Sequence, residues 1–183
     1  FIVTLAEIFT PYLVYLIAPG FVVDDGKFNL AVEFTRITFP FLLFVSLSSF
    51  FSGILNSNNK FAAAAAAPII LNVILIISIL VSYIQDLNIA KQLSYGVTVA
   101  GILQLIFLIY FSFKFYKPSI KFKFKVTNKL KIFFKKLLPS IFSSGVTQIN
   151  ILVGTIIASF QSGAVSYLYY ADRVYQINLA IAG

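Results

Sequence analysis

Residues 61–83 read FAAAAAAPIILNVILIISILVSY, a run without a single charged side chain. A helix needs roughly 20 predominantly apolar residues to cross the hydrocarbon core of a bilayer, and this run is long enough. Because lipid offers the backbone no hydrogen-bonding partner, a single segment that crosses it has to be helical. The run therefore predicts a transmembrane helix and an all-α membrane protein.

Similar apolar stretches extend this interpretation to the whole chain. The sequence is 60% hydrophobic and 11% charged, with a mean hydropathy of +0.94, whereas soluble domains are about 45–50% apolar. The chain begins and ends inside apolar runs, so we expect it to be a fragment of a longer polytopic helix bundle. The six predicted spans are 1–18, 34–55, 61–83, 94–115, 137–160 and 164–183.

The residue types that are missing exclude several classes of function. The 183 residues contain no cysteine and no histidine, which excludes disulfides, thiol nucleophiles, imidazole acid–base chemistry and ordinary zinc sites within the chain. No paired carboxylates, nucleophile with a base, or phosphate-binding loop are evident either. We therefore expect no enzyme activity, no metal site and no cofactor.

The basic residues are concentrated in one connector. Residues 114–136 contain nine lysines and no acidic residue, and the positive-inside rule places such a connector in the cytoplasm. Counting spans outward puts 56–60 on the same side, so that ten of the fourteen Lys and Arg residues lie inside. Lys27, Arg36 and Lys91 lie outside, and Arg173 falls within a span. The sequence thus predicts a multi-pass inner-membrane protein with a cytoplasmic connector.

The second half of this connector has the pattern of an amphipathic helix on the inner leaflet. One side of the helical wheel carries Leu130, Phe133, Phe134, Leu137 and Leu138, and the other carries Lys129, Lys131, Lys135 and Lys136. The preceding residues 121–125 alternate Lys and Phe, as in an extended stretch at the headgroups. Beside six spans, anionic membrane lipids are the expected partner of these lysines and nucleic acid is not.

Asp172 and Arg173 are the strongest candidates for a functional site. They lie about nine residues, or roughly 14 Å, into a span that begins near Ala164. A charge at that depth costs from about 3 to more than 10 kcal/mol, so it normally faces a cavity or a partner. Adjacent residues point about 100° apart on a helix, and we therefore expect each of the two to have its own partner.

Polar residues accompany this pair on two successive spans. Those at helical spacings from Arg173 are Ser166, Tyr169, Tyr170 and Gln176, and those along 137–160 are Ser140, Ser144, Gln148, Thr155 and Ser159. Two facing polar stripes predict the wall of a hydrated cavity with a cationic centre. The alternative is that the hydroxyls and Gln148 only bridge packed helices, and the sequence leaves both interpretations open.

Several motifs, taken in order, resemble the MurJ/MviN family over nearly the whole chain, the lysine-rich connector excepted. They are Arg36-Ile-Thr-Phe-Pro40, Gly53-Ile-Leu-Asn56-Ser, Ala67-Pro68 with Leu71-Asn72, Val97 to Leu105, Leu138-Pro139-Ser-Ile, Gln148-Ile-Asn, Ala158-Ser-Phe160 and above all Ser166-Tyr-Leu-Tyr-Tyr-Ala-Asp172-Arg173.

The resemblance implies a fourteen-helix, two-lobed transporter of the multidrug/oligosaccharidyl-lipid/polysaccharide superfamily. Members flip lipid II, the undecaprenyl-diphosphate-linked muropeptide, across the inner membrane by alternating access during cell wall biosynthesis. On this mapping, 1–113 hold the third to sixth helices in the N-terminal lobe. Residues 114–136 link the lobes, and 137–183 begin the C-terminal lobe with the seventh and eighth helices.

The resemblance also implies roles for individual residues. The arginine at the position of Arg173 faces the cavity and engages the diphosphate of the lipid, and the aspartate at the position of Asp172 is also functionally important. We accordingly take Arg173, Asp172, Ser166, Gln176, Tyr170 and Gln148 as candidate substrate-binding residues. Two positions depart from the pattern: Gly154 replaces a carboxylate that binds sodium in some members, and Gln176 stands where a glutamate is common.

Two alternatives to a lipid II flippase follow from the same observations. A related polysaccharide or drug exporter would share the architecture, although it usually lacks the Tyr-Tyr-Ala-Asp-Arg segment at 169–173. The expected incompleteness of the chain also allows an inactive fragment of a split gene.

Overall fold

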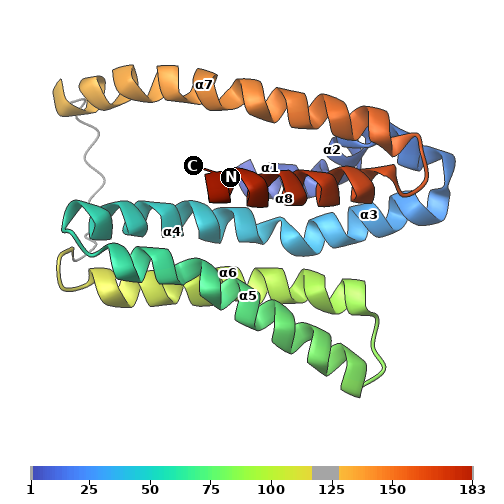
Figure 1. The fold of residues 1–183 in the computed structure, drawn as a ribbon, viewed down its shortest axis with the longest axis horizontal. Helices are drawn as coiled ribbons and strands as arrows, with labels where there is room; N and C mark the ends of the chain where they lie inside the picture. The colour runs from blue at the N-terminus through green and yellow to red at the C-terminus, as the bar shows by residue number, and fades with distance from the viewer. Residues whose placement is uncertain (1, 117–127, 183) are drawn as a thin grey trace. The chain divides into compact units, whose positions relative to one another are not determined.

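The computed structural model describes residues 2–116 and 128–182, which form α-helices, one short 3₁₀ helix and no β-strand. The predicted all-α class is confirmed. In chain order the elements are α1 (Ile2–Ile8), α2 (Thr10–Ile17), η1 (Pro19–Val23), α3 (Asp25–Thr38), α4 (Pro40–Ser57), α5 (Phe61–Ile84), α6 (Ile89–Ser112), α7 (Asn128–Ser159) and α8 (Ala164–Ala182) (Figure 1).

Four helical stretches in the described part of the chain are long and apolar enough to cross a membrane. They are Asp25–Ser57, Phe61–Ile84, Ile89–Ser112 and Leu130–Ser159, and they correspond to the second to fifth predicted spans. The first predicted span is divided into α1 and α2, and the sixth, α8, carries several polar side chains that lower its hydropathy. Those two spans remain predictions.

The division between α1 and α2 has a local cause in Pro11. Proline has no backbone N–H, so Pro11 cannot donate to the carbonyl oxygen of Glu7 four residues earlier. The hydroxyl of Thr10 donates to that oxygen instead, at 2.9 Å, and to the carbonyl oxygen of Ala6 at the same distance. The helix is interrupted at Phe9, where one uninterrupted helix over 1–18 was expected.

The second span begins earlier than predicted. The side-chain oxygen of Asp24 accepts a hydrogen bond from the backbone N–H of Lys27 at 3.2 Å, an N-capping contact that lets α3 start at Asp25. The sequence predicted a start at Phe34, because the first turns of α3 are polar and have a low mean hydropathy. The helix is interrupted again at Phe39, since α3 ends at Thr38 and α4 starts at Pro40, whereas α5 continues through Pro68.

The chain forms two compact units, residues 1–11 with 29–120 and residues 12–28 with 121–183. In the first unit, α6 packs against both α5 and α4, and the three helices lie side by side (Figure 1). Their buried core consists of Phe51, Leu55, Ala67 and Leu108. The small side chains at the start of α5 allow this packing, with Ala67 in the core and Ala63 packed against it.

Glycine and polar side chains allow the close approach of these helices. A Cβ on Gly101 of α6 would lie 2.7 Å from a ring carbon of Phe41 in α4. Gln104 of α6 donates from Nε2 to the carbonyl oxygen of Ala67 in α5 at 2.8 Å, a hydrogen bond between the two helices. The other polar side chain within the apolar run of α5, Asn72, is exposed and makes no hydrogen bond within the described residues.

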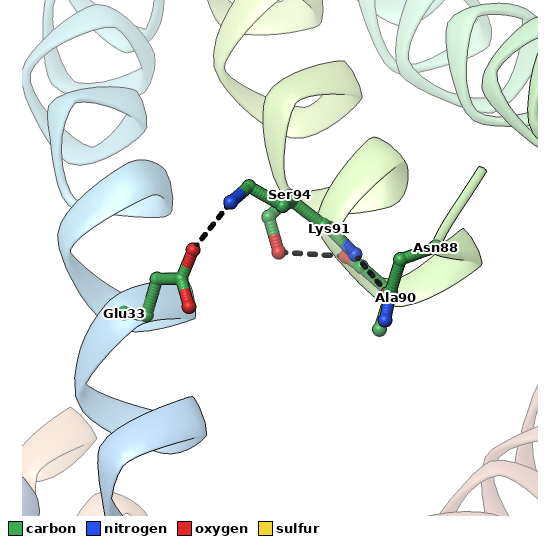
Figure 2. A network of polar contacts seen from close by, with 5 residues as sticks. All are labelled: Glu33, Asn88, Ala90, Lys91 and Ser94. Atoms are coloured by element: carbon green, nitrogen blue, oxygen red, sulfur yellow. Dashed lines mark hydrogen bonds and ion pairs between the residues drawn. The ribbon is translucent and has the colours of Figure 1, made fainter.

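An ion pair and a capping contact organise the N-terminal end of α6. Nζ of Lys91 lies 2.7 Å from Oε1 of Glu33 in α3, and Figure 2 shows the lysine side chain reaching across between the two helices. The side chain of Asn88 caps α6 by accepting from the backbone N–H of Lys91 at 3.0 Å. Both residues of the ion pair come from the side predicted to be periplasmic.

In the second unit, α7 packs against η1 and α8. Gly20 of η1 donates its backbone N–H to Oγ of Ser159 at 3.0 Å. A Cβ on Gly20 would lie 2.3 Å from the carbonyl oxygen of Ser159, so only glycine fits this approach. Helix α7 continues without interruption from Asn128 through Pro139, and the amphipathic segment predicted at 130–138 is its first part. The stretch predicted at 121–125 lies outside the described residues.

Candidate functional site

The candidate site residues on α8 are positioned by the tight turn that precedes this helix. Gly163 has φ of +76°, a left-handed conformation that glycine adopts without strain, and α8 begins at the next residue, Ala164. At 1.5 Å per residue, Arg173 lies about 14 Å along the helix axis. The predicted start of this helix near Ala164 is therefore confirmed.

The Arg173 guanidinium is held by neutral partners on its own helix. Nη2 donates to the hydroxyl of Tyr169 at 2.7 Å, and Nη1 donates to Oε1 of Gln176 at 3.1 Å. The ring of Tyr169 also lies under the guanidinium, with Cζ 4.8 Å from the ring centroid. These contacts orient the side chain, and no carboxylate in the described part of the chain forms an ion pair with it.

Asp172 shares Gln176 as a partner with Arg173, whereas the sequence predicted a separate partner for each of them. Its Oδ2 accepts a hydrogen bond from Nε2 of Gln176 at 2.6 Å. Gln176 therefore connects the two charged residues, since its amide oxygen accepts from Arg173 and its amide nitrogen donates to Asp172. Within residues 2–116 and 128–182, Asp172 and Arg173 form no direct ion pair.

A cavity of about 330 Å³ lies between α7 and α8. Its polar lining comes from Asn150 and Thr155 of α7 and from Tyr169 and Asp172 of α8, and Gly154 forms part of its wall. The sequence predicted a cavity between these helices, but with Arg173 at its centre. In the structure Asp172 lines the cavity, and Arg173 lies beside it as an exposed side chain that contacts the lining residue Tyr169.

The other predicted site residues lie further from this cavity. Ser166, Tyr170 and Gln148 are exposed and are not part of its lining. The ring of Tyr170 packs edge-to-face against Tyr169, with centroids 6.3 Å apart. Asn150 was missed as a candidate, although an asparagine inside an apolar run and four residues before Gly154 was a usable signal.

The hydroxyls of the α7 stripe bond mainly to their own helix. Ser140 donates to the carbonyl oxygen of Lys136, Thr155 to that of Ile151 and Ser159 to that of Ile156. Ser159 also accepts from Gly20, which ties η1 to α7. The contact of Ser159 with Gly20 joins two elements, as the packing interpretation expects, whereas the bond of Ser140 stays within its own helix and Thr155 also lines the cavity.

The Arg173 guanidinium has the donors needed to recognise an anion. A guanidinium has five N–H donors in a planar fork that matches phosphate oxygens, and the contacts to Tyr169 and Gln176 use part of this set. Among the described residues, no group of three or more His, Cys, Asp or Glu side chains is arranged to hold a metal ion. The remaining N–H donors of Arg173 are available to an anion.

Comparison with known proteins identifies relatives along the entire chain. A family model described as "Lipid II flippase MurJ" matches residues 1–183. A probable lipid II flippase MurJ of Rickettsia prowazekii is 44% identical over 189 residues, which cover 100% of this chain and 36% of that protein. Proteins with the same description from Rhizobium tropici and Haemophilus influenzae are 40% and 33% identical, covering 97% and 98% of the chain and 34% and 37% of their own lengths. The chain spans about a third of these curated relatives.

Proposed function

The chain belongs to the lipid II flippase MurJ family, and on this premise we propose that it forms part of a transporter that flips lipid II across the inner membrane by alternating access. Family membership and four long apolar helices make it a multi-pass inner-membrane protein. The family match over residues 1–183 favours this function over that of a related drug or polysaccharide exporter.

The observation that carries the proposal is the uncompensated charge of Arg173. Its hydrogen-bond partners, Tyr169 and Gln176, are both neutral. A cation about 14 Å along a membrane helix is costly unless it faces water or an anion. The diphosphate of lipid II is such an anion, and charge-assisted, bidentate hydrogen bonds from a guanidinium are among the strongest available to it.

The neighbouring residues have supporting roles in this proposal. Gln176 holds Asp172 and Arg173 at a fixed relative position through its two hydrogen bonds. Asp172 places a negative charge at the cavity, and this charge limits how tightly a phosphate is retained. Ser166, Tyr170 and Gln148 are exposed polar side chains that contact the muropeptide or the sugar when the remaining helices complete the cavity.

The proposed architecture has residues 1–113 in the N-terminal lobe and 137–183 in the C-terminal lobe. Residues 114–136 form the cytoplasmic linker, and its lysines contact anionic lipids of the inner leaflet. Support comes from the charge asymmetry of the sequence and from the exposure of Lys131, Lys135 and Lys136 on the described part of the linker.

The test is rescue of cells depleted of their own lipid II flippase by the complete coding sequence that carries this chain. We expect Arg173→Ala to abolish or strongly reduce growth, because the diphosphate loses its cationic partner. Arg36→Ala is the matched control, since Arg36 is also exposed on a helix and forms no ion pair within the described residues. Membrane levels of each variant are measured by immunoblot. Equal rescue by Arg173→Ala and Arg36→Ala would contradict the proposed role.

A further inference from the structure

A groove in the first unit combines an apolar wall with two lysines, and it shares no residue with the candidate site on α8. We propose that this groove binds an anionic glycerophospholipid, with the lipid phosphate between Lys60 and Lys114 and one acyl chain along the apolar wall. The groove has a volume of about 330 Å³ and lies where α4 ends, α5 begins and α6 ends. These three helix ends meet at one end of the bundle (Figure 1).

The wall of the groove is apolar and partly open. Leu55 forms its buried floor, Ala62 belongs to the first turn of α5, and Phe111 and Phe115 are large aromatic side chains that remain 43% and 39% exposed. The small side chain of Ala62 leaves space beside the two rings. An acyl chain would cover apolar surface that the protein itself leaves uncovered, in a volume at the lower end of the range for small-molecule sites.

The two lysines give the rim of the groove a positive charge that the described residues do not neutralise. Neither Lys60 nor Lys114 forms an ion pair within residues 2–116 and 128–182. The acidic residues nearest to them in sequence are Glu33 of α3, which pairs with Lys91 near the start of α6, and Asp86 in the connector between the end of α5 and the start of α6. The charge of the rim is therefore complementary to a lipid phosphate.

The depth of the lysines favours a membrane lipid over a soluble anion. Lys60 immediately precedes the span Phe61–Ile84, and Lys114 follows the span Ile89–Ser112 by two residues. Both therefore lie at headgroup level, next to the hydrocarbon that surrounds the spans. Basic pockets between transmembrane helices at this level bind anionic headgroups. The simpler alternative is that both lysines only extend to the interface without selecting a lipid.

The test is photolabelling of the whole chain, reconstituted in vesicles with a trace of phosphatidylglycerol that carries a diazirine on one acyl chain. Labelled positions are mapped by mass spectrometry of peptides. We expect labelling around residues 62 and 111–115, and about fivefold less labelling for each of Lys60→Gln and Lys114→Gln. The same diazirine on phosphatidylcholine should label these positions only weakly.

The matched control is Lys135→Gln, which removes one exposed lysine of α7 and changes the net charge as much as each of the two test variants does. It should leave labelling of the groove unchanged. Equal labelling by the two lipids would overturn the proposal, and so would an equal loss of labelling in the control and in the Lys60 and Lys114 variants. Either result would mean that the two lysines lie at the interface without forming a lipid site.

A second variant tests the acyl-chain part of the groove. Ala62→Phe fills the space beside Phe111 and leaves both lysines in place, so we expect labelling by phosphatidylglycerol to fall severalfold. Ala62 is exposed at the start of α5, so the helix content measured by circular dichroism should not change. Labelling that persists in Ala62→Phe and is displaced by glycerol 3-phosphate would show a headgroup contact only and contradict the proposed lipid site.

Discussion

Gln104 of α6 is buried, and its Nε2 donates to the carbonyl oxygen of Ala67 in α5 at 2.8 Å, while its Oε1 has no hydrogen-bond partner in the described part of the chain. The hydroxyl of Ser48 in α4 is the other buried side-chain group without a partner there. The amide nitrogen of Gln104 thus stabilises the α5–α6 contact, whereas its buried, unpaired amide oxygen lowers the stability of the fold.

Replacing Gln104 separates these two contributions. Gln104→Leu removes the bonded donor and the unpaired acceptor together, so the stability of the α4–α6 bundle should change by less than about 1 kcal/mol. Gln104→Glu has no donor for Ala67 and adds a carboxylate to a buried position, and it should be the more destabilising variant. Denaturant unfolding in micelles measures both, and a Gln104→Leu loss as large as that of Gln104→Glu would contradict the prediction.

Gly101 should not tolerate a larger side chain. A Cβ there would lie 2.7 Å from the Phe41 ring and 3.2 Å from Cβ of Phe44, so Gly101→Ala forces α4 and α6 apart and should cost about 1–3 kcal/mol. Gly53 is the control, because a Cβ on Gly53 meets no atom within 4 Å. Gly53→Ala should be neutral or stabilising by about 0.5–1 kcal/mol, as measured by thermal unfolding of the two variants in the same detergent.

Tyr169 should contribute to transport through the orientation of Arg173. Tyr169→Phe removes the hydroxyl that accepts from Nη2 but leaves the ring under the guanidinium. The rate of lipid II transport by the complete protein should therefore fall about two- to tenfold, as expected for one hydrogen bond, and less than in Arg173→Ala. Tyr175→Phe, which changes an exposed tyrosine of the same helix, should have no effect. Equal rates for the two tyrosine variants would exclude this orienting role.

The proposed orientation predicts which loops react with a membrane-impermeant maleimide. The chain has no cysteine, so a single introduced thiol gives an unambiguous signal. Gln85→Cys, at the exposed end of α5, should be labelled in intact spheroplasts, and Asn58→Cys, in the exposed α4–α5 turn, only after the membrane is opened. The reverse pattern would mean that the linker 114–136 is periplasmic.

Hydropathy was sufficient to predict the central helices of the fold. The helix predicted at 61–83 is observed as Phe61–Ile84, because an uncharged run has one stable conformation in lipid. The start of α3 was missed because it depends on the cap by Asp24 and not on apolar residues. The interruption at Phe9 was also missed, since it depends on which group bonds to the carbonyl oxygen of Glu7 beside Pro11.

The sequence predicted which positions belong to the candidate site, but not how their side chains are arranged in space. Spacing along a helix placed Tyr169 and Gln176 within reach of Arg173, and the structure confirms both contacts. That Gln176 would also donate to Asp172 depends on side-chain rotamers, which residue spacing does not determine. That Asp172 rather than Arg173 lines the cavity depends on the rotation of α8 against α7, which is set by packing around Gly154 and Leu168.

The bond from Gly20 to Ser159 joins positions 139 residues apart. A ribosome that adds about 5 to 20 residues per second needs about 7 to 28 s to make the intervening chain. Throughout that interval η1 already exists and its binding surface on α7 does not. Docking of η1 is therefore delayed, because it must wait until the end of α7, 139 residues further along the chain, has been synthesised and inserted.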